Sequence, residues 1–250
     1  MLRVFHPGPW PEIGGEITLG GEESSHLVRV RRARVGETIV LLDGRGGVAE
    51  CSIAEAEPRA ARLRMEKVTW HSQPVPRVLA VGLPKGDTFV EIIRQATELG
   101  ATEIQPLLTD RGEVKLDKER AEKKLDRWRA TALEACKQSG NPWQPKIHAA
   151  VALGPWVKKF SGMSENLLRL VAALTPEAIS VAELPAPRSL RAPYCLLPVI
   201  FCVGPEGDFS PEEYAEFKAA GFQFVRLPGH VLRVETACAV ALAIVQTAEK

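Results

Sequence analysis

The alternation of short apolar runs with amphipathic segments after residue 76 constrains the fold most. Val78–Gly82 is apolar throughout and suits a strand buried in a parallel sheet. From Phe89 to Leu99, apolar residues then recur at helical spacing, and Gly100 follows where a glycine commonly ends a helix. Alternating strands and helices predict an α/β domain with a parallel sheet. By the same reasoning we expect strands over 104–108, 167–174, 199–203 and 224–227, and helices over 117–139, 211–221 and 235–248.

The first 70 residues follow a different pattern. Segments 37–42 and 48–53 are short and rich in β-branched residues, and glycines with an aspartate lie between them, so we expect a hairpin within a small β-barrel. His71–Pro76 then contains two prolines in three residues, which interrupt regular structure. We therefore predict a β-barrel domain over 1–72 and an α/β domain over 73–250. Prolines over 185–198 predict an extended loop.

The composition is that of a globular protein in a reducing compartment. The chain has 250 residues, of which 45% are hydrophobic and 25% charged. It contains no apolar run of the ~20 residues that span a bilayer and no apolar leader, so we expect a cytoplasmic protein without membrane contact. The five cysteines are scattered without a CxxC pair. This argues against a disulfide framework or a metal site, and predicts buried thiols.

The charge pattern contains one dense basic run. The net charge is only +1, so the whole-chain balance does not indicate a nucleic-acid partner. The run comprises Arg29, Arg31, Arg32 and Arg34. Two interpretations stay open: a solvated face, or a surface that contacts phosphate groups.

A glycine loop follows the expected strand 199–203. Its sequence is GPEGDF, in which Gly204 and Gly207 would allow a ligand to approach the backbone closely. In open α/β sheets, ligands bind at the carboxyl ends of strands. The loop matches neither GxGxxG nor a phosphate-binding P-loop, and an ordinary tight turn remains the alternative. Ser210-Pro211-Glu212-Glu213 then predicts a helix start with a capping box.

A second unusual segment brings charged residues into an apolar stretch. Arg233 and Glu235 interrupt the apolar run 231–244. A glutamate at a helix start is explained by the helix dipole, whereas the arginine is not. Because burying an unpaired guanidinium is costly, we expect Arg233 to have a partner, either Glu235 or a ligand.

Taken together, these segments resemble the 16S ribosomal RNA uridine-N3 methyltransferase family, in the SPOUT class of S-adenosylmethionine-dependent enzymes. The resemblance covers nearly the whole chain in order, and GPEG followed about thirty residues later by LRxETA is its specific part. The N-terminal segment resembles that family's PUA-like RNA-binding domain. The chain departs from the family pattern at Asn141, Asp208, Pro228 and His230. The matching segments are HLVRVRRARVGETIVLLDGRG at 26–46, GLPKGDTFVEIIRQATELGATEIQPLLTDR at 82–111, EACKQSG at 134–140, VGPEGDFSPEE at 203–213 and LPGHVLRVETACAVALA at 227–243.

The resemblance implies a deep C-terminal trefoil knot, whose loops hold S-adenosylmethionine in a bent shape, and a homodimer in which both subunits complete each site. It implies binding to 16S rRNA or the 30S subunit through the arginine run together with Lys85 and Arg94. The cofactor-binding residues it implies are Leu174, Val203, Gly204, Pro205, Gly207, Leu227, Pro228, Gly229, Val231, Leu232, Thr236 and Ala237.

The implied reaction makes two demands on the protein. N3 of uridine carries a proton at neutral pH, so the reaction needs a proton acceptor and a cation that stabilises charge on O2 and O4. Arg233 suits the cation, while Glu206 and Glu235 are alternative acceptors. N3 lies on the pairing edge, so the target must be unpaired or flipped out. Two other functions remain: methylation elsewhere on RNA, such as a ribose 2′-hydroxyl, and non-catalytic binding during ribosome assembly.

Overall fold

The computed structural model describes residues 1–112, 118–163, 166–184 and 197–246. Most of the predicted proline-rich loop, residue 117 and residues 247–248 of the predicted last helix lie outside these ranges. The chain divides into two compact units. The N-terminal unit comprises residues 1–73 and 133–144, and the C-terminal unit comprises 74–132 and 145–250.

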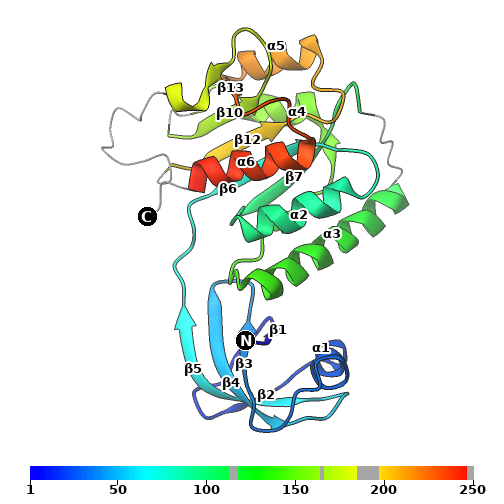
Figure 1. The fold of residues 1–250 in the computed structure, drawn as a ribbon, viewed down its shortest axis with the longest axis vertical. Helices are drawn as coiled ribbons and strands as arrows, with labels where there is room; N and C mark the ends of the chain where they lie inside the picture. The colour runs from blue at the N-terminus through cyan, green and yellow to red at the C-terminus, as the bar shows by residue number, and fades with distance from the viewer. Residues whose placement is uncertain (113–117, 164–165, 185–196, 247–250) are drawn as a thin grey trace. The chain divides into compact units, whose positions relative to one another are not determined.

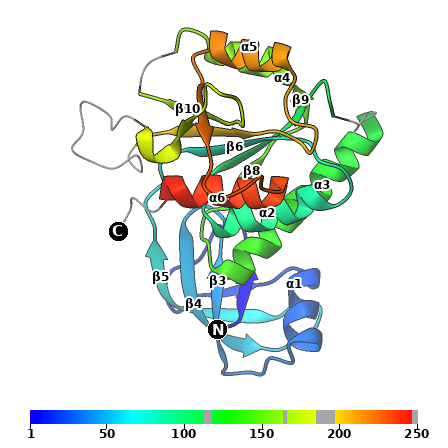
Figure 2. The same ribbon diagram turned by 45° about the horizontal axis from the view of Figure 1, so that its top comes forward.

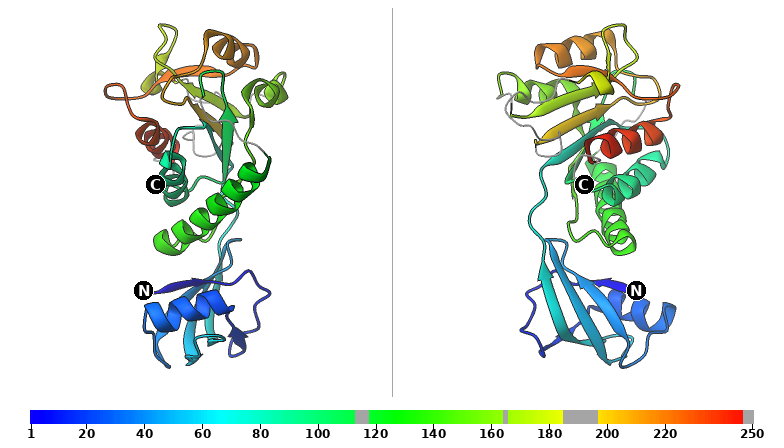
Figure 3. Two further views of the ribbon diagram at one scale, coloured as in Figure 1. Left: turned by 90° about the vertical axis from the view of Figure 1, so that its right-hand side faces the viewer. Right: turned by 60° about the vertical axis from the view of Figure 1, so that its left-hand side comes forward.

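The N-terminal unit is a five-stranded sheet around one apolar core. Its strand order is β1-β3-β4-β5-β2; only β1 and β3 pair in parallel. Figure 3 shows these strands, in blue and cyan, with the short helix α1 beside them. Leu27, Leu41, Ile53 and Leu63 are fully buried in this core. The elements are β1 (Arg3–Phe5), β2 (Glu16–Thr18), α1 (Gly21–Ser25), a π-helical turn (His26–Val30), β3 (Thr38–Leu42), β4 (Gly47–Glu55) and β5 (Arg62–Trp70).

The predicted hairpin is confirmed. Strands β3 and β4 pair antiparallel, with Leu42 opposite Val48. The buried carboxylate of Asp43 closes the turn, since its Oδ1 accepts hydrogen bonds from the backbone N–H groups of Arg45 at 2.7 Å and Gly47 at 2.8 Å. The turn therefore has the Asx chemistry that the aspartate and glycines predicted.

The C-terminal unit contains a parallel sheet, as predicted. Its strand order is β11-β13-β10-β12-β6-β7-β8, with β9 also pairing with β7, and every recorded pair is parallel. The two-residue strands β8, β9 and β11 were not predicted, because so short a segment has no recognisable period. The strands are β6 (Arg77–Gly82), β7 (Glu103–Leu108), β8 (Lys146–Ile147), β9 (Val151–Ala152), β10 (Leu168–Ala172), β11 (Ile179–Ser180), β12 (Val199–Val203) and β13 (Gln223–Arg226).

Helices cover both faces of this sheet (Figures 1 and 2). One apolar core packs Leu79 and Phe201 of the sheet against α2 (Thr88–Glu98) and α6 (Val234–Gln246). On the other face, Ala80 and Cys202 pack against α4 (Leu153–Val157) and α5 (Pro211–Ala219). Neighbouring residues of one strand thus enter different cores, as the two-residue period of a strand requires. Two 3₁₀ turns (Lys158–Phe160 and Val181–Glu183) complete this unit.

The predicted helices form, and two of their ends have the predicted residues at the predicted places. Helix α2 ends before Gly100, whose φ is 71°, and α5 begins with the full capping box of Ser210 and Glu213. Helix α3 (Lys118–Ser139) begins in the C-terminal unit, and its last turns belong to the N-terminal unit. None of the described helices is long and apolar enough to cross a membrane. The four cysteines that the structure describes are buried, and Cys195 lies outside the described residues.

Candidate cofactor and RNA site

Three neighbouring strands of the parallel sheet end at one pocket. Strand β10 lies between β13 and β12, so the carboxyl ends of all three lie at the same edge. The segments that follow them enclose a pocket of about 500 Å³. This volume lies within the range of small-molecule sites. The pocket is lined by Thr88, Ala172, Ala173, Leu174, Val203, Gly204, Pro205, Glu206, Asp208, Leu227, His230, Val231, Leu232, Arg233, Val234, Glu235 and Ala237.

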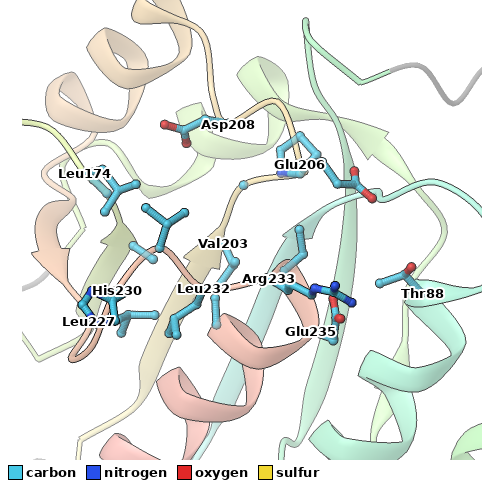
Figure 4. A pocket seen from close by; sticks show the side chains of 17 residues that line it. Thr88, Leu174, Val203, Glu206, Asp208, Leu227, His230, Leu232, Arg233 and Glu235 are labelled. Atoms are coloured by element: carbon cyan, nitrogen blue, oxygen red, sulfur yellow. The ribbon is translucent and has the colours of Figure 1, made fainter.

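The pocket has a mainly apolar side and a polar side (Figure 4). Leu174, Leu227 and Leu232 lie on one side together with His230, while Glu206 and Arg233 lie on the other with Thr88 and Glu235. Such a division suits a ligand with an apolar ring at one end and a charged reacting group at the other.

Glycines let the loop after β12 pack closely against its neighbours. A Cβ on Gly82, at the end of β6, would lie 2.8 Å from the backbone nitrogen of Pro205. A Cβ on Gly204 would lie 3.1 Å from Oδ1 of Asp208. A side chain at Gly82 would collide with the loop, and one at Gly204 would crowd Asp208. The glycine at position 204 thus makes room for the side chain of Asp208, and close approach of a ligand to this backbone stays a prediction.

Asp208 occupies a position where glycine would be favoured. Its φ is 59°, in the left-handed region, which aspartate tolerates better than most residues. Its Oδ1 accepts hydrogen bonds from the backbone N–H of Phe209 and from the hydroxyl of Tyr214, each at 2.8 Å. These bonds stabilise the unusual backbone conformation. Burial, and next the hydrogen bond to Asp208, raise the pKa of Tyr214, so its hydroxyl remains a donor.

Glu213 joins the loop after β7 to the loop after β12. Its side chain is buried, and its two oxygens accept from the backbone N–H groups of Asp110, at 2.9 Å, and Ser210, at 2.8 Å. Burial raises the pKa of Glu213, and its hydrogen bonds to these two amides oppose that rise only in part. Arg111 adds a second link, since its Nη1 donates to the carbonyl of Gly207 at 3.1 Å. The segment after β12 is thus joined at two points to the loop after β7.

Arg233 lies at the pocket with its side chain exposed. Of the two partners expected for Arg233, Glu235 does not form an ion pair with it, and neither does any other described residue, so a ligand is the expected partner that remains. The apolar character of the segment belongs instead to Val234 and Ala237, which are buried. The guanidinium therefore keeps its hydrogen-bonding capacity for a ligand.

The two carboxylates considered as proton acceptors differ in their surroundings. Glu206 is exposed, and its Oε1 accepts from the backbone N–H of Lys85 at 3.3 Å. Glu235 is partly buried in the first turn of α6, where the helix dipole stabilises a negative charge. Both line the pocket.

The pocket brings together most of the residues singled out in the sequence. Thr88, Asp208 and His230 also line it, and no pattern in the sequence marked Thr88. Among the described residues, no group of three or more metal-ligating side chains is arranged to hold a metal ion. The predicted cofactor-binding residues that do not line the pocket are Gly207, Pro228, Gly229 and Thr236.

The residues predicted to bind RNA are exposed. Arg29, Arg31, Arg32 and Arg34 lie in or just after the π-helical turn, and none makes an ion pair within the described chain. Lys85 and Arg94 belong to the C-terminal unit, where Arg94 pairs with Glu91 at 3.1 Å.

The residues that line the pocket suit S-adenosylmethionine. Its apolar side can accommodate an adenine ring, and Glu206 and Glu235 can face a sulfonium or ammonium group. Arg233 can pair with a carboxylate. A parallel sheet with such a pocket at its strand ends defines an α/β enzyme domain that binds a small charged ligand.

Comparison with known proteins identifies the particular family. Residues 71–246 match the model of an RNA methyltransferase domain, and residues 19–66 match an RNA methyltransferase PUA domain. The chain therefore belongs to this family of RNA methyltransferases.

Proteins similar to this chain include named ribosomal RNA methyltransferases and solved structures. It is 36% identical to ribosomal RNA small subunit methyltransferase E of Synechocystis, over 92% of this chain and 73% of that protein. The structure of the protein of the same name from Neisseria gonorrhoeae, bound to S-adenosyl methionine, matches with a TM-score of 0.84 at 28% identity, over 99% of this chain and 97% of that one. A putative methyltransferase from Legionella pneumophila in complex with SAM matches with a TM-score of 0.85 at 29% identity, over 99% and 97%.

Proposed function

We propose that this enzyme transfers a methyl group from S-adenosylmethionine to N3 of a uridine in 16S ribosomal RNA. The observation that carries the proposal is the pocket at the ends of β10, β12 and β13, which brings Glu206 of the GPEG loop beside Arg233 of the LRVETA segment. The names of the relatives support small-subunit ribosomal RNA as the substrate. The resemblance described above supports uridine N3.

The chain's own residues meet the two demands of the reaction. S-Adenosylmethionine, when bound, supplies an electrophilic methyl group whose bond to sulfur breaks as the bond to N3 forms, leaving that electron pair on sulfur. The exposed guanidinium of Arg233 stabilises the negative charge that spreads onto O2 and O4 of the uracil. Glu206 or Glu235 accepts the N3 proton, and both remain candidates. Alignment of the base in the pocket supplies much of the rate.

The proposal includes the assembly and location of the enzyme. A trefoil knot and a homodimer with shared sites are implied by the resemblance, and a cytoplasmic location is the expectation from the apolar pattern and the cysteines of the sequence. The dimer gains support from α6, which buries Cys238 and Leu242 on one face and leaves Val240 and Ile244 partly exposed on another. An apolar face of this kind favours association.

Methylation in vitro tests the proposal directly. Purified enzyme and S-adenosylmethionine would be incubated with unmodified 16S rRNA or with 30S subunits, and the digested nucleosides analysed by mass spectrometry. We expect 3-methyluridine, and the comparison identifies which form of RNA is the substrate. Ribose 2′-O-methylation would instead show a different position of attack. Absence of both products, together with no heat of S-adenosylmethionine binding in calorimetry, would show a non-catalytic binder.

A further inference from the structure

A second cavity lies in the N-terminal unit, outside the site described above. Its volume is about 410 Å³. The residues around it come from the strand β1 region, the π-helical turn and the end of α3, all of which belong to this one unit. The cavity is lined by Met1, Leu2, Arg3, His26, Arg31, Glu134, Lys137 and Gln138.

A hydrogen bond within this cavity orients Arg31. Its Nε donates to Nε2 of His26 at 3.3 Å. Because an arginine N–H can only donate, Nε2 of His26 is the acceptor of this hydrogen bond. The two terminal amino groups of Arg31 make no ion pair within the described residues. They form the planar fork that binds two oxygens of a phosphate side by side.

Arg3 neutralises the negative end of α3, which would otherwise repel an anion. The last carbonyls of a helix carry partial negative charge. Nη1 of Arg3 donates to the carbonyls of Lys137, at 3.1 Å, and Gln138, at 2.8 Å, and so neutralises this end of α3.

The side chains that line the cavity carry more positive than negative charge. Lys137 forms ion pairs of 2.6 Å with both Glu23 and Glu134. Burial by itself would lower the pKa of Lys137. The two carboxylates raise it by more than burial lowers it, so the net pKa is raised and the ammonium remains charged. Of the charged side chains that line the cavity, three are cations, Arg3, Arg31 and Lys137, and one is a carboxylate, Glu134. This positive excess favours an anion such as a phosphodiester.

We propose that this cavity binds one phosphate group of the RNA backbone, held by the terminal amino groups of Arg31 and oriented through His26. The proposal rests on the proposed RNA substrate and goes beyond it by assigning a site. Of the four arginines in the basic run, only Arg31 lines the cavity. The run is therefore not a uniform basic surface.

The first arm of the test uses inorganic phosphate without RNA. We expect the ring ¹⁵N resonances of His26 to shift with phosphate in a saturable way, while those of His6 and His148 stay unchanged as internal references. Arg31→Ala should abolish the shift. A His26 spectrum that does not respond to phosphate would overturn the site.

The second arm measures the affinity for a single-stranded RNA fragment at several salt concentrations, without S-adenosylmethionine. Arg31→Ala should lower the slope of log affinity against log salt by roughly 0.7, the value of one lost phosphate contact. Arg59→Ala removes an exposed cation of the same unit outside the cavity, and should leave the slope unchanged.

The outcomes separate this proposal from the proposed function. If Arg31→Ala methylates rRNA and keeps the wild-type slope, the RNA-backbone site is wrong while the methyltransferase stands. A His26 response to phosphate together with that unchanged slope would show a site for free anions only. A wild-type protein that binds no RNA would overturn both proposals.

Discussion

The hydroxyl of Tyr214 donates a 2.8 Å hydrogen bond to Oδ1 of Asp208, across one turn at the start of α5. Asp208 has a φ of 59° and lines the pocket. A side chain of α5, which packs on the opposite face of the sheet from α6, therefore stabilises the conformation of a loop that lines this pocket.

Tyr214→Phe should weaken binding of S-adenosylmethionine. The substitution removes a donor from a carboxylate, which costs about 1–2 kcal/mol of stability because a hydrogen bond to a charged group is lost. We expect the dissociation constant measured by calorimetry to rise severalfold, with a matching fall in the urea midpoint. An unchanged affinity would mean that the loop holds its conformation without Tyr214.

Replacing Asp208 should separate backbone strain from hydrogen bonding. Asp208→Gly loses the side-chain bonds but adopts a positive φ freely, whereas Asp208→Ala loses the same bonds and is also strained. We expect the alanine variant to be less stable than the glycine variant by about 1 kcal/mol in urea unfolding. Equal stabilities would contradict a role for the backbone conformation.

Glu213→Gln should destabilise the protein in a way that depends on pH. Burial raises the pKa of Glu213 in the folded protein above its ordinary value of 4.5. The folded wild type therefore loses stability relative to the unfolded chain as pH rises from 4.5 through the raised pKa, because the buried carboxyl must then ionise. Glutamine has no such ionisation, and it offers one oxygen to the two amides. The stability difference between wild type and variant should therefore shrink as pH rises through this window. Urea unfolding between about pH 4 and 7 measures it, and a difference that widens with pH would contradict the raised pKa.

Arg233→Ala should slow methyl transfer more than it weakens cofactor binding. If the guanidinium stabilises charge on the uracil, the single-turnover rate should fall by about 10²–10³-fold, as for loss of one oxyanion donor. The affinity for S-adenosylmethionine should fall by less than tenfold, and Arg233→Lys should rescue little because an ammonium lacks the planar fork. Lys159→Ala, an exposed cation outside the pocket, serves as the control. A cofactor affinity that collapses with the rate would make Arg233 a cofactor ligand instead.

The enzyme should sediment as a dimer. At micromolar concentration we expect a mass of about twice 27.3 kDa. Val240→Glu on the partly exposed face of α6 should shift the equilibrium toward monomer, since an interface would then bury an unpaired charge. A strictly monomeric and fully active wild-type protein would contradict the shared site.

Local patterns in the sequence determined the helices and strands and the loops that line the pocket. The apolar run Val199–Val203, the glycines that follow it and the capping box at Ser210 were all readable, because each depends on neighbours within a few residues. The resemblance of the GPEG and LRVETA segments to one family likewise needed only their order along the chain.

The tertiary structure determined which residues of those segments come into contact. Glu213 was readable as a capping residue, but its bond to the amide of Asp110 joins positions 103 residues apart. The sequence left Glu235 and a ligand open as partners of Arg233, whereas the fold places this side chain exposed at the pocket, just before α6, without an ion pair to Glu235. Arg31 was one of four equivalent arginines until the fold placed the end of α3 beside it. Sequence periodicity specifies which face of an element is apolar, but long-range packing determines which polar side chains meet, because those contacts depend on strand order and helix placement.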